Sequence, residues 1–339
     1  MNRFLLFVVL ASTLGASTPL YMTFGLENGY DSNVLRLSEL EKGEAAHYLD
    51  MLGGMETFDS HILKGSIQGK KEYYIRGRVL AFSGSFGLTN YSHSTHKQYN
   101  SHRLLVSYKL GSYKKIDYLI NHLDQYYLRH YIDRDISSTL LNAAAFTDRN
   151  QRIGFSYPLL KRTWLNIWGG YLQRYYNNPF TEFDLDIYYG KIKINRSIRK
   201  FGTVGIQFEQ GRAVNKTFGE TAVASDFDRS YNYYQFYIPI SKTKRNRWTD
   251  GVGFSTRADI RTYDAENLSD PLHAGRNHLD LKLDVWAKKN ITEWITLKST
   301  LRYRSRSTKS QFEWVESLKS FSQWQLACKL EWNMIYDKY

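Results

Sequence analysis

The feature that most constrains the fold is a strict alternation of apolar and polar residues within many short segments. Near the C-terminus every second residue over 324–336 is apolar, while Gln325, Lys329 and Glu331 stand among the polar ones. A period of two places the two sets on opposite faces of a β-strand. The same pattern recurs over 252–260 and 279–285. These segments predict a sheet with one apolar and one polar face.

The links between the segments decide which kind of sheet this is. The short links are 69–71, 111–113, 159–162, 196–201, 241–249 and 289–291, and they alternate with long links at 31–57, 87–98, 131–150, 214–229, 264–275 and 306–320; 177–181 is an exception. The predicted strands are 20–30, 58–69, 72–86, 99–110, 114–130, 151–158, 163–176, 182–195, 202–213, 230–242, 250–263, 276–288, 292–305 and 321–336.

Short turns at one end and long loops at the other, with an even number of strands, are typical of barrels in the bacterial outer membrane. The sequence therefore predicts an all-β fold, a closed antiparallel up-and-down transmembrane β-barrel of about 14 strands. Lipid tolerates no unpaired strand edge, so the strand at 322–336 must pair with the strand at 20–30. A bulge at Gly190 would reconcile the two halves of the strand at 182–195, which differ in phase.

The N-terminus predicts export through a cleaved signal peptide. Arg3 precedes an apolar run from Phe4 to Ala11, and the small residues Gly15, Ala16 and Ser17 follow. This is the order of a secretory signal, and the run is too short for a transmembrane helix. A buried first strand is the alternative. We expect a removed signal peptide over 1–17 and one barrel domain over 18–339, in the outer membrane of a Gram-negative bacterium.

Composition agrees with a barrel and limits its partners. Aromatic residues make up 16% of the chain, and the mean hydropathy is −0.51. Transmembrane barrels combine these traits because only their outer face meets lipid. The net charge of +13 comes from bases in and beside the short links, which suggests contact with anionic lipid headgroups or simple turn solubility. No nucleic-acid-binding module is recognised. The expected partners are outer-membrane lipids and the barrel assembly machinery.

Alternation also predicts a polar lumen, lined either by a charged eyelet that selects solutes or by a salt-bridged wall. The charged and polar candidates for this lining are Lys64, Arg76, Arg78, Asp184, Asp186, Gln207, Glu209, Arg257, Asp259, Arg261, Asp280, Lys282, Asp284, Lys298, Arg302, Arg304, Lys329 and Glu331. Apolar residues at the end of the last strand form a candidate insertion signal, namely Trp332, Met334 and Tyr336.

The first long loop differs from the others. Residues 36–52 carry an apolar stripe, and Ser38 and Glu41 resemble a capping box, so we expect a helix there. The loop is acidic. It either folds into the mouth, where its acids would face Arg76 and Arg78 and favour cations, or lies outside as a lid or recognition element. A second helix is expected over 138–146.

Catalytic, cofactor and metal sites are not expected. His93, His96 and His102 lie in or beside one loop but lack further ligands in register, so we interpret them as solvated. His122 and Asp124 share the less polar face of their strand, which we interpret as a local change of phase. The sequence contains no P-loop, dinucleotide fingerprint or cysteine pair. We therefore expect a non-enzymatic protein without a cofactor.

The segment from Gly25 to Val34 carries a resemblance, sharpest over Gly29-Tyr30-Asp31-Ser32-Asn33-Val34. It resembles the first-strand motif of a group of outer-membrane barrels that includes β-barrel porins and the C-terminal barrel of surface lipoprotein assembly modifiers. The modifiers also carry an N-terminal helical-repeat domain that this sequence lacks, which favours the porin-like role. The expected function is a channel for small polar solutes. The alternatives are a translocator or assembly factor for surface proteins or lipoproteins, with a surface lipoprotein as partner, and a surface adhesin or receptor.

Overall fold

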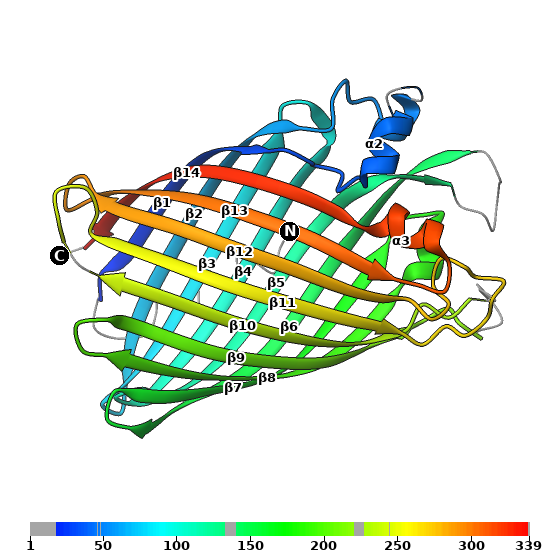
Figure 1. Ribbon diagram of the computed structural model, residues 1–339. Helices are drawn as coiled ribbons and strands as arrows, with labels where there is room; N and C mark the ends of the chain where they lie inside the picture. Colours follow the sequence, from blue (N-terminus) through cyan, green and yellow to red (C-terminus); the bar gives the residue numbers. More distant parts are fainter. Residues whose placement is uncertain are drawn as a thin grey trace.

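The structure, a computed structural model, describes residues 18–45, 47, 49–132, 140–219, 227–243 and 245–337. The predicted signal peptide over 1–17 lies outside the described residues. Fourteen strands close into one antiparallel barrel in which each strand pairs with its neighbours in sequence and β14 pairs with β1 (Figure 1). This confirms the predicted fold class. The strands are β1 (Leu20–Asp31), β2 (Ser60–Ile75), β3 (Arg78–Tyr91), β4 (Ser94–Gly111), β5 (Lys114–Ile132), β6 (Leu141–Leu160), β7 (Thr163–Tyr176), β8 (Leu185–Ile198), β9 (Gly202–Asn215), β10 (Tyr231–Thr243), β11 (Gly251–Tyr263), β12 (Asn277–Asn290), β13 (Ile295–Lys309) and β14 (Phe321–Tyr336).

The closing pair of strands has the predicted partners. Leu20 stands opposite Tyr336, and the register runs without a break to Asp31 opposite Gln325. Closure leaves neither strand with a free edge, so every ladder position can pair its backbone N–H and C=O groups. The terminal segments of the barrel are therefore held as firmly as the strands between them.

The two faces of the barrel wall differ as the alternation predicts. On β12, Leu281 and Val285 are 40% and 53% exposed, whereas Asp280, next to Leu281, is only 3% exposed. Directly opposed residues on neighbouring strands share a face, and the register places Arg306 of β13 beside Asp280. The apolar set therefore forms the outer surface, and the charged set faces the lumen.

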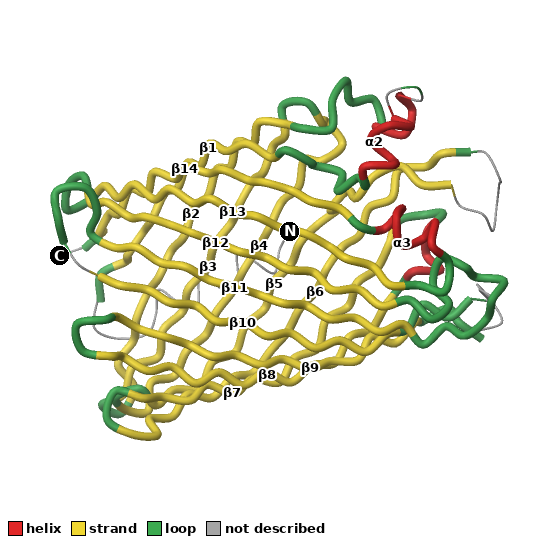
Figure 2. The backbone as a smooth tube through the Cα atoms, in the orientation of Figure 1, coloured by secondary structure: helices red, strands yellow, loops and turns green. Residues whose placement is uncertain are grey.

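The barrel has two unlike ends. The short helices α2 (Glu39–Ala45) and α3 (Glu313–Lys319) and the longer loops lie at one end, here called the loop end. The C-terminal end of β14 lies at the other, the turn end (Figure 2). Two short 3-10 helices, η1 (Leu49–Leu52) and η2 (Phe180–Phe183), also lie in loop-end connections. No helix in the described part of the chain is long and apolar enough to cross a membrane.

Three predicted links are wrong. The link predicted over 131–150 is shorter, because β6 begins at Leu141. Residues 69–71 are not a turn, because β2 continues to Ile75 and the turn is Arg76–Gly77. The long loop predicted over 87–98 is a tight turn at 92–93, and β3 and β4 extend to it. The strand ends near this turn carry polar residues on both faces, so they lack the apolar alternation by which the other segments were recognised.

The change of phase also lies elsewhere than predicted. β8 pairs with β7 and β9 without a register shift, so Gly190 is not a bulge. Instead Leu185 and Ile187 face inward at the loop end and pack with Ala213 and Tyr231. An apolar cluster inside the mouth produces the pattern that suggested a bulge.

The bulge is in β5. The register of β5 against β6 shifts between Leu123 and Tyr126, and Gln125 has a positive φ of 46°. One extra residue reverses the phase. His122 and Asp124 therefore share the outer face, and Tyr126 turns into the lumen. The expected local change of phase is thus a β-bulge in the strand.

Of the two predicted helices, one is a strand in the structure and the other forms in part. The helix over 138–146 is wrong over the described residues, since Leu141–Phe146 belong to β6. Ala144 and Ala145 favour a helix locally, but they pair with Arg129 and Tyr127 of β5 and are buried. Ladder pairing outweighs the helix propensity here. The helix predicted over 36–52 forms in two shorter pieces, α2 and η1.

Candidate functional site: the charged lumen and its loop-end constriction

The structure places most of the predicted lining residues on one face, which is the inner one. The strand registers put the following on the lumen side: Lys64, Gln207, Glu209, Arg257, Asp259, Arg261, Asp280, Lys282, Asp284, Lys298, Arg302, Arg304, Lys329 and Glu331. Opposite charges pair across neighbouring strands, as in Arg302–Asp284 at 2.5 Å and Lys64–Glu27 at 2.8 Å. The lining is thus both a salt-bridged wall and a charged surface that a solute would meet.

Four predicted lining residues lie elsewhere. Arg76 is in the turn between β2 and β3, and Arg78 begins β3 on the outward set, so both are at the turn end. Asp186 stands opposite Gln173 on the outer face and accepts hydrogen bonds from tyrosines there. Asp184 follows η2, where its carboxylate accepts the Tyr176 N–H at 2.6 Å. The predicted contact between the acids of the first loop and Arg76 and Arg78 is therefore wrong.

The lumen is more open at mid-barrel than at the loop end. The inward side chains of Arg302 and Lys329, at mid-barrel and near the turn end, keep 39% and 30% of their surface accessible. Near the loop end, Arg304 keeps 14% and Asp280 keeps 4%. Because all of these groups face inward, the difference indicates a water-accessible lumen that narrows toward the loop end.

A set of basic side chains converges in this narrow region, and we call it the loop-end basic cluster. Its members come from the first loop, β4, β5, β11, the β11–β12 loop, β13 and α3, namely Arg36, Lys97, Arg129, Arg261, Arg276, Arg304, Arg306 and Lys319. Several lie over aromatic rings, with the Arg276 guanidinium 4.0 Å from the ring centroid of Tyr263 and Arg306 5.3 Å from that of Phe321. Such contacts hold a cation against a ring face.

Sequence reasoning found only Arg261 and Arg304 of this cluster. Arg36 and Lys319 were counted as loop residues, and Lys97 and Arg129 fell in segments whose alternation is interrupted. Some members of the cluster do have an aromatic residue two positions along the chain, as in Arg129 and Tyr131, Arg261 and Tyr263, and Lys319 and Phe321. Their convergence depends on loops folding over the barrel, which strand periodicity does not encode.

The first loop packs across one side of the mouth. Its apolar residues Val34, Leu37 and Leu52 are buried in one cluster with the inward-facing Ile62 of β2 and Tyr91 of β3. The predicted capping box is present, because the Glu41 N–H donates to Ser38 Oγ at 3.1 Å and the Ser38 N–H donates to Glu41 Oε2 at 2.9 Å. The apolar stripe of the loop is thus covered by the barrel wall.

An ion pair joins this loop to β5. Arg129 Nη1 lies 2.7 Å from Glu41 Oε1, and both side chains are almost fully buried. Removing one partner of a buried pair leaves the other charge unpaired and costs about 3–5 kcal/mol of stability. In Glu41→Gln the capping hydrogen bonds can be kept while the charge is lost. We expect proteinase K to cleave the first loop at least about tenfold faster in this variant.

The control for that experiment is Glu39→Gln. Glu39 pairs with Lys42 at 2.8 Å, but its side chain is 79% exposed. An exposed pair contributes about 0–1 kcal/mol, so cleavage should stay near the wild-type rate. Equal acceleration in the two variants would contradict the anchoring role of Glu41.

The helix α3 brings Lys319 to the same place. The Lys319 Nζ lies 5.6 Å from the ring centroid of Tyr131. Burial and the neighbouring guanidiniums of Arg129, Arg276 and Arg306 lower the pKa of Lys319 to about 7, against the opposing effect of Glu41. α2 and α3 contact one another. Lys319 is thus a lysine whose charge changes near neutral pH when α3 is docked.

This pKa predicts pH-dependent docking of α3. An undocked lysine titrates near pH 10.4, so between pH 7 and pH 10 docking releases a proton and becomes more favourable as the pH rises. Below pH 7 the lysine is protonated in both states, so the full cost of burying its charge opposes docking. We expect proteinase K to cut the 310–320 loop more slowly at pH 9 than at pH 7, relative to an unstructured peptide. Lys319→Met should remove this dependence. A dependence that persists in the variant would assign it to another group.

The three histidines that were interpreted as solvated lie at separate places in the β3–β4 hairpin. His93 lies in the turn between β3 and β4, while His96 and His102 are on β4. The rings of His102 and His122 lie 6.0 Å apart on the outer face. Within the residues that the structure describes, no three His, Cys, Asp or Glu side chains gather into a potential metal site.

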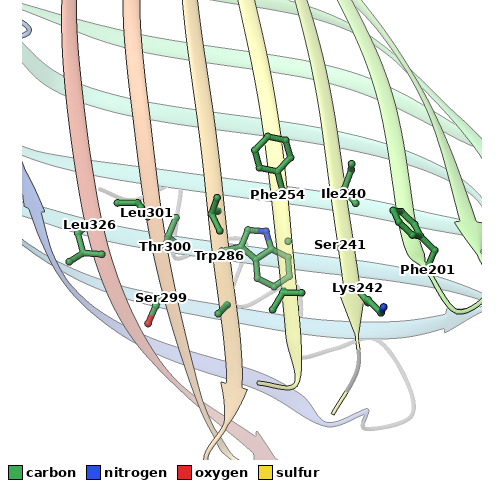
Figure 3. Close-up of a pocket in the computed structure, with 14 residues that line it drawn as sticks. Phe201, Ile240, Ser241, Lys242, Phe254, Trp286, Ser299, Thr300, Leu301 and Leu326 are labelled. Carbon is green, nitrogen blue, oxygen red and sulfur yellow. The ribbon is translucent and has the colours of Figure 1, made fainter. Parts of the chain in front are cut away.

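An apolar groove lies on the outer surface near the turn end (Figure 3). Its walls include Ile240, Phe254, Val285, Leu301 and Leu326, which the registers place on the outward face. The groove therefore belongs to the apolar band of the barrel and not to the lumen.

The candidate insertion signal lies on the same outer surface. Trp332, Met334 and Tyr336 stand opposite Phe24, Met22 and Leu20. Trp332 and Tyr336 are more than half exposed. Their outward position at the turn end makes them available for contact with lipid or with another protein.

Comparison with known proteins finds fold likeness alone. No family model and no curated protein matches the chain. Among solved structures, it is similar to OccAB4 of Acinetobacter baumannii, at 8% identity over 94% of this chain and 99% of that one, with a TM-score of 0.43. It is also similar to an anion-selective porin from Comamonas acidovorans, at 8% identity over 94% and 100% of the two chains, with a TM-score of 0.43. A bacterial polysaccharide outer membrane secretin matches at 8% identity over 94% and 100%, with a TM-score of 0.44.

Proposed function

We propose that this protein is an outer-membrane channel for the passive diffusion of small polar solutes. The observation that carries the proposal is the lumen itself. A closed barrel with an apolar outer surface encloses charged side chains, and those at mid-barrel stay accessible to water, as Arg302 does at 39% of its side-chain surface. Barrels of more than about eight strands are too wide for side chains alone to fill.

The apolar outer surface supports placement in a membrane. Leu281, Leu301 and Leu326 are 40–56% exposed on adjoining strands, and in water such a surface would be costly. A closed barrel also leaves no strand edge unpaired in lipid. Several charged lumen side chains are engaged in ion pairs, such as Arg302–Asp284 and Lys64–Glu27, and we propose no catalytic role for them.

Planar-bilayer recording of the purified protein tests the proposal. Stable single-channel steps whose size scales with salt concentration are the expected result. Heat-modifiable migration in gels should be used to show that the barrel is folded. Silence over a range of voltages and salts from a folded barrel would contradict the channel function.

A further inference from the structure

Arg36 is a half-buried cation in the mouth, and no ion pair joins it to an acid among the described residues. It follows β1 in the first loop with a positive φ of 56°, a backbone conformation that a residue with a side chain rarely adopts. Its side chain crosses toward β5, where Nη2 donates to the Tyr126 hydroxyl at 3.3 Å. Its Nε is buried without a hydrogen-bond acceptor. The loop thus holds a guanidinium in the mouth at a cost in backbone energy.

A second guanidinium faces it from β13. Arg304 stands opposite Gln323 of β14, whose side chain donates to Asp31 and to the Asn33 carbonyl, three residues before Arg36. Arg304 Nη2 binds Asp280 Oδ2 at 3.1 Å, but its Nε is also buried without an acceptor. Both arginines therefore lie at the loop end of the lumen, each with a buried N–H donor unused.

The neighbouring groups are one base, Lys97, and one acid, Asp31. Lys97 is 2% exposed, donates from Nζ to the Val34 carbonyl at 2.8 Å, and lies 5.0 Å from the ring centroid of Tyr126. Asp31 is nearby, but its carboxylate already accepts hydrogen bonds from Gln323 and Gln325 at 2.7–2.8 Å.

The remaining acids are also engaged. Asp280 is held by Arg304 and Arg306 and Glu41 by Arg129, as described above. Positive charge is in excess here, because the four bases Arg36, Lys97, Arg304 and Arg306 stand with only two acids, Asp31 and Asp280, and an excess of one sign of charge in a poorly hydrated region is unfavourable. An anion that enters the site would supply the missing charge.

We propose that Arg36, Arg304 and Lys97, with the hydroxyl of Tyr126, bind the carboxylate group of a small anionic solute in the barrel. This site would give the proposed channel its substrate class, and the inference rests on that function. The planar guanidinium fork matches a carboxylate with two parallel hydrogen bonds. The same wall already contains such a pair, because Arg306 binds both oxygens of Asp280 at 2.8 Å.

The location of the site suits a channel that selects its solute. The site lies where the lumen is narrowest, so a permeating molecule must pass it. Charged side chains in a water-poor constriction concentrate ions of the opposite sign. The first loop contributes Arg36, so the site is complete only when that loop is packed against the barrel.

Titration calorimetry of the folded protein in detergent, with succinate as the probe, tests the site directly. We expect saturable binding of succinate that weakens about tenfold or more in Arg304→Gln and in Arg36→Gln. Arg36→Gln changes no strand residue, so it keeps the test valid if Arg304→Gln fails to fold. Arg304→Lys should bind with intermediate strength, because it keeps the charge and loses the fork.

The matched control is Arg302→Gln, which removes the same charge from the same face of β13, two residues away, and should change succinate affinity less than about twofold. Equal loss in Arg302→Gln, an absence of saturable binding, or tighter binding of inorganic phosphate than of succinate would each overturn the carboxylate site.

Bilayer recording separates the two proposals. If the protein conducts but succinate changes neither its conductance nor its selectivity, the channel proposal stands and the carboxylate site is overturned. Succinate binding by calorimetry in a protein that does not conduct would retain the site and overturn the channel.

Discussion

Replacing residues 38–53 with a short Gly-Ser linker is expected to raise the single-channel conductance about two- to threefold, since the narrowest section of a pore dominates its resistance. This segment contains α2 and η1, which pack over the β2–β6 side of the mouth, and α2 contacts α3. The deletion leaves Arg36 in the chain, so the change reports on width more than on the loss of that charge.

A matched replacement of residues 245–249 serves as the control, because that link is at the turn end, away from the constriction. Its conductance should stay close to that of the unaltered protein. Unchanged conductance in the 38–53 variant, with a barrel that still migrates as folded, would show that the first loop does not narrow the pore.

Asp280→Asn is expected to lower the free energy of unfolding by about 3–5 kcal/mol. The carboxylate is 3% exposed and accepts three hydrogen bonds, two from Arg306 at 2.8 Å and one from Arg304 at 3.1 Å. Its loss leaves two buried guanidiniums without a counter-charge, next to Arg261 and His278. Guanidinium-induced unfolding in phospholipid vesicles, followed by tryptophan fluorescence, measures the change.

The comparison variant is Asp284→Asn, two positions along the same inner face of β12. Asp284 also binds an arginine, Arg302 at 2.5 Å, but that pair is more accessible to water. Solvent screening reduces the contribution of such a pair, so a loss of about 1 kcal/mol or less is expected. A loss in Asp280→Asn no greater than this would mean that water reaches the loop-end constriction freely.

Much of the wall follows from the sequence alone. An alternation with period two fixes the face of each residue once the strand is located, which explains why Arg257, Asp259, Lys282 and Arg302 were assigned to the lumen by number. The errors fall at strand ends. Arg78 and Asp186 lie there, where one residue more or less reverses the face.

The pairing of β1 with β14 was also determined by the sequence. It depends on no particular contact, because a membrane-spanning sheet has to close on itself. Sequence motifs predicted local structure correctly where a few neighbouring residues hydrogen-bond to one another, as in the capping box of Ser38 and Glu41. They failed at Leu141–Phe146, where pairing with β5 outweighs the helix propensity of three successive alanines.

Only the tertiary structure decided the candidate site. Arg36, Lys97, Arg129, Arg304 and Lys319 are distant in sequence and come from two loops and three strands. Each of them alone is an ordinary surface-type residue, and periodicity cannot say that they meet. They meet because the apolar stripe of the first loop is buried against Ile62 and Tyr91, and this packing, a property of the closed barrel, carries the charges of the loop into the mouth.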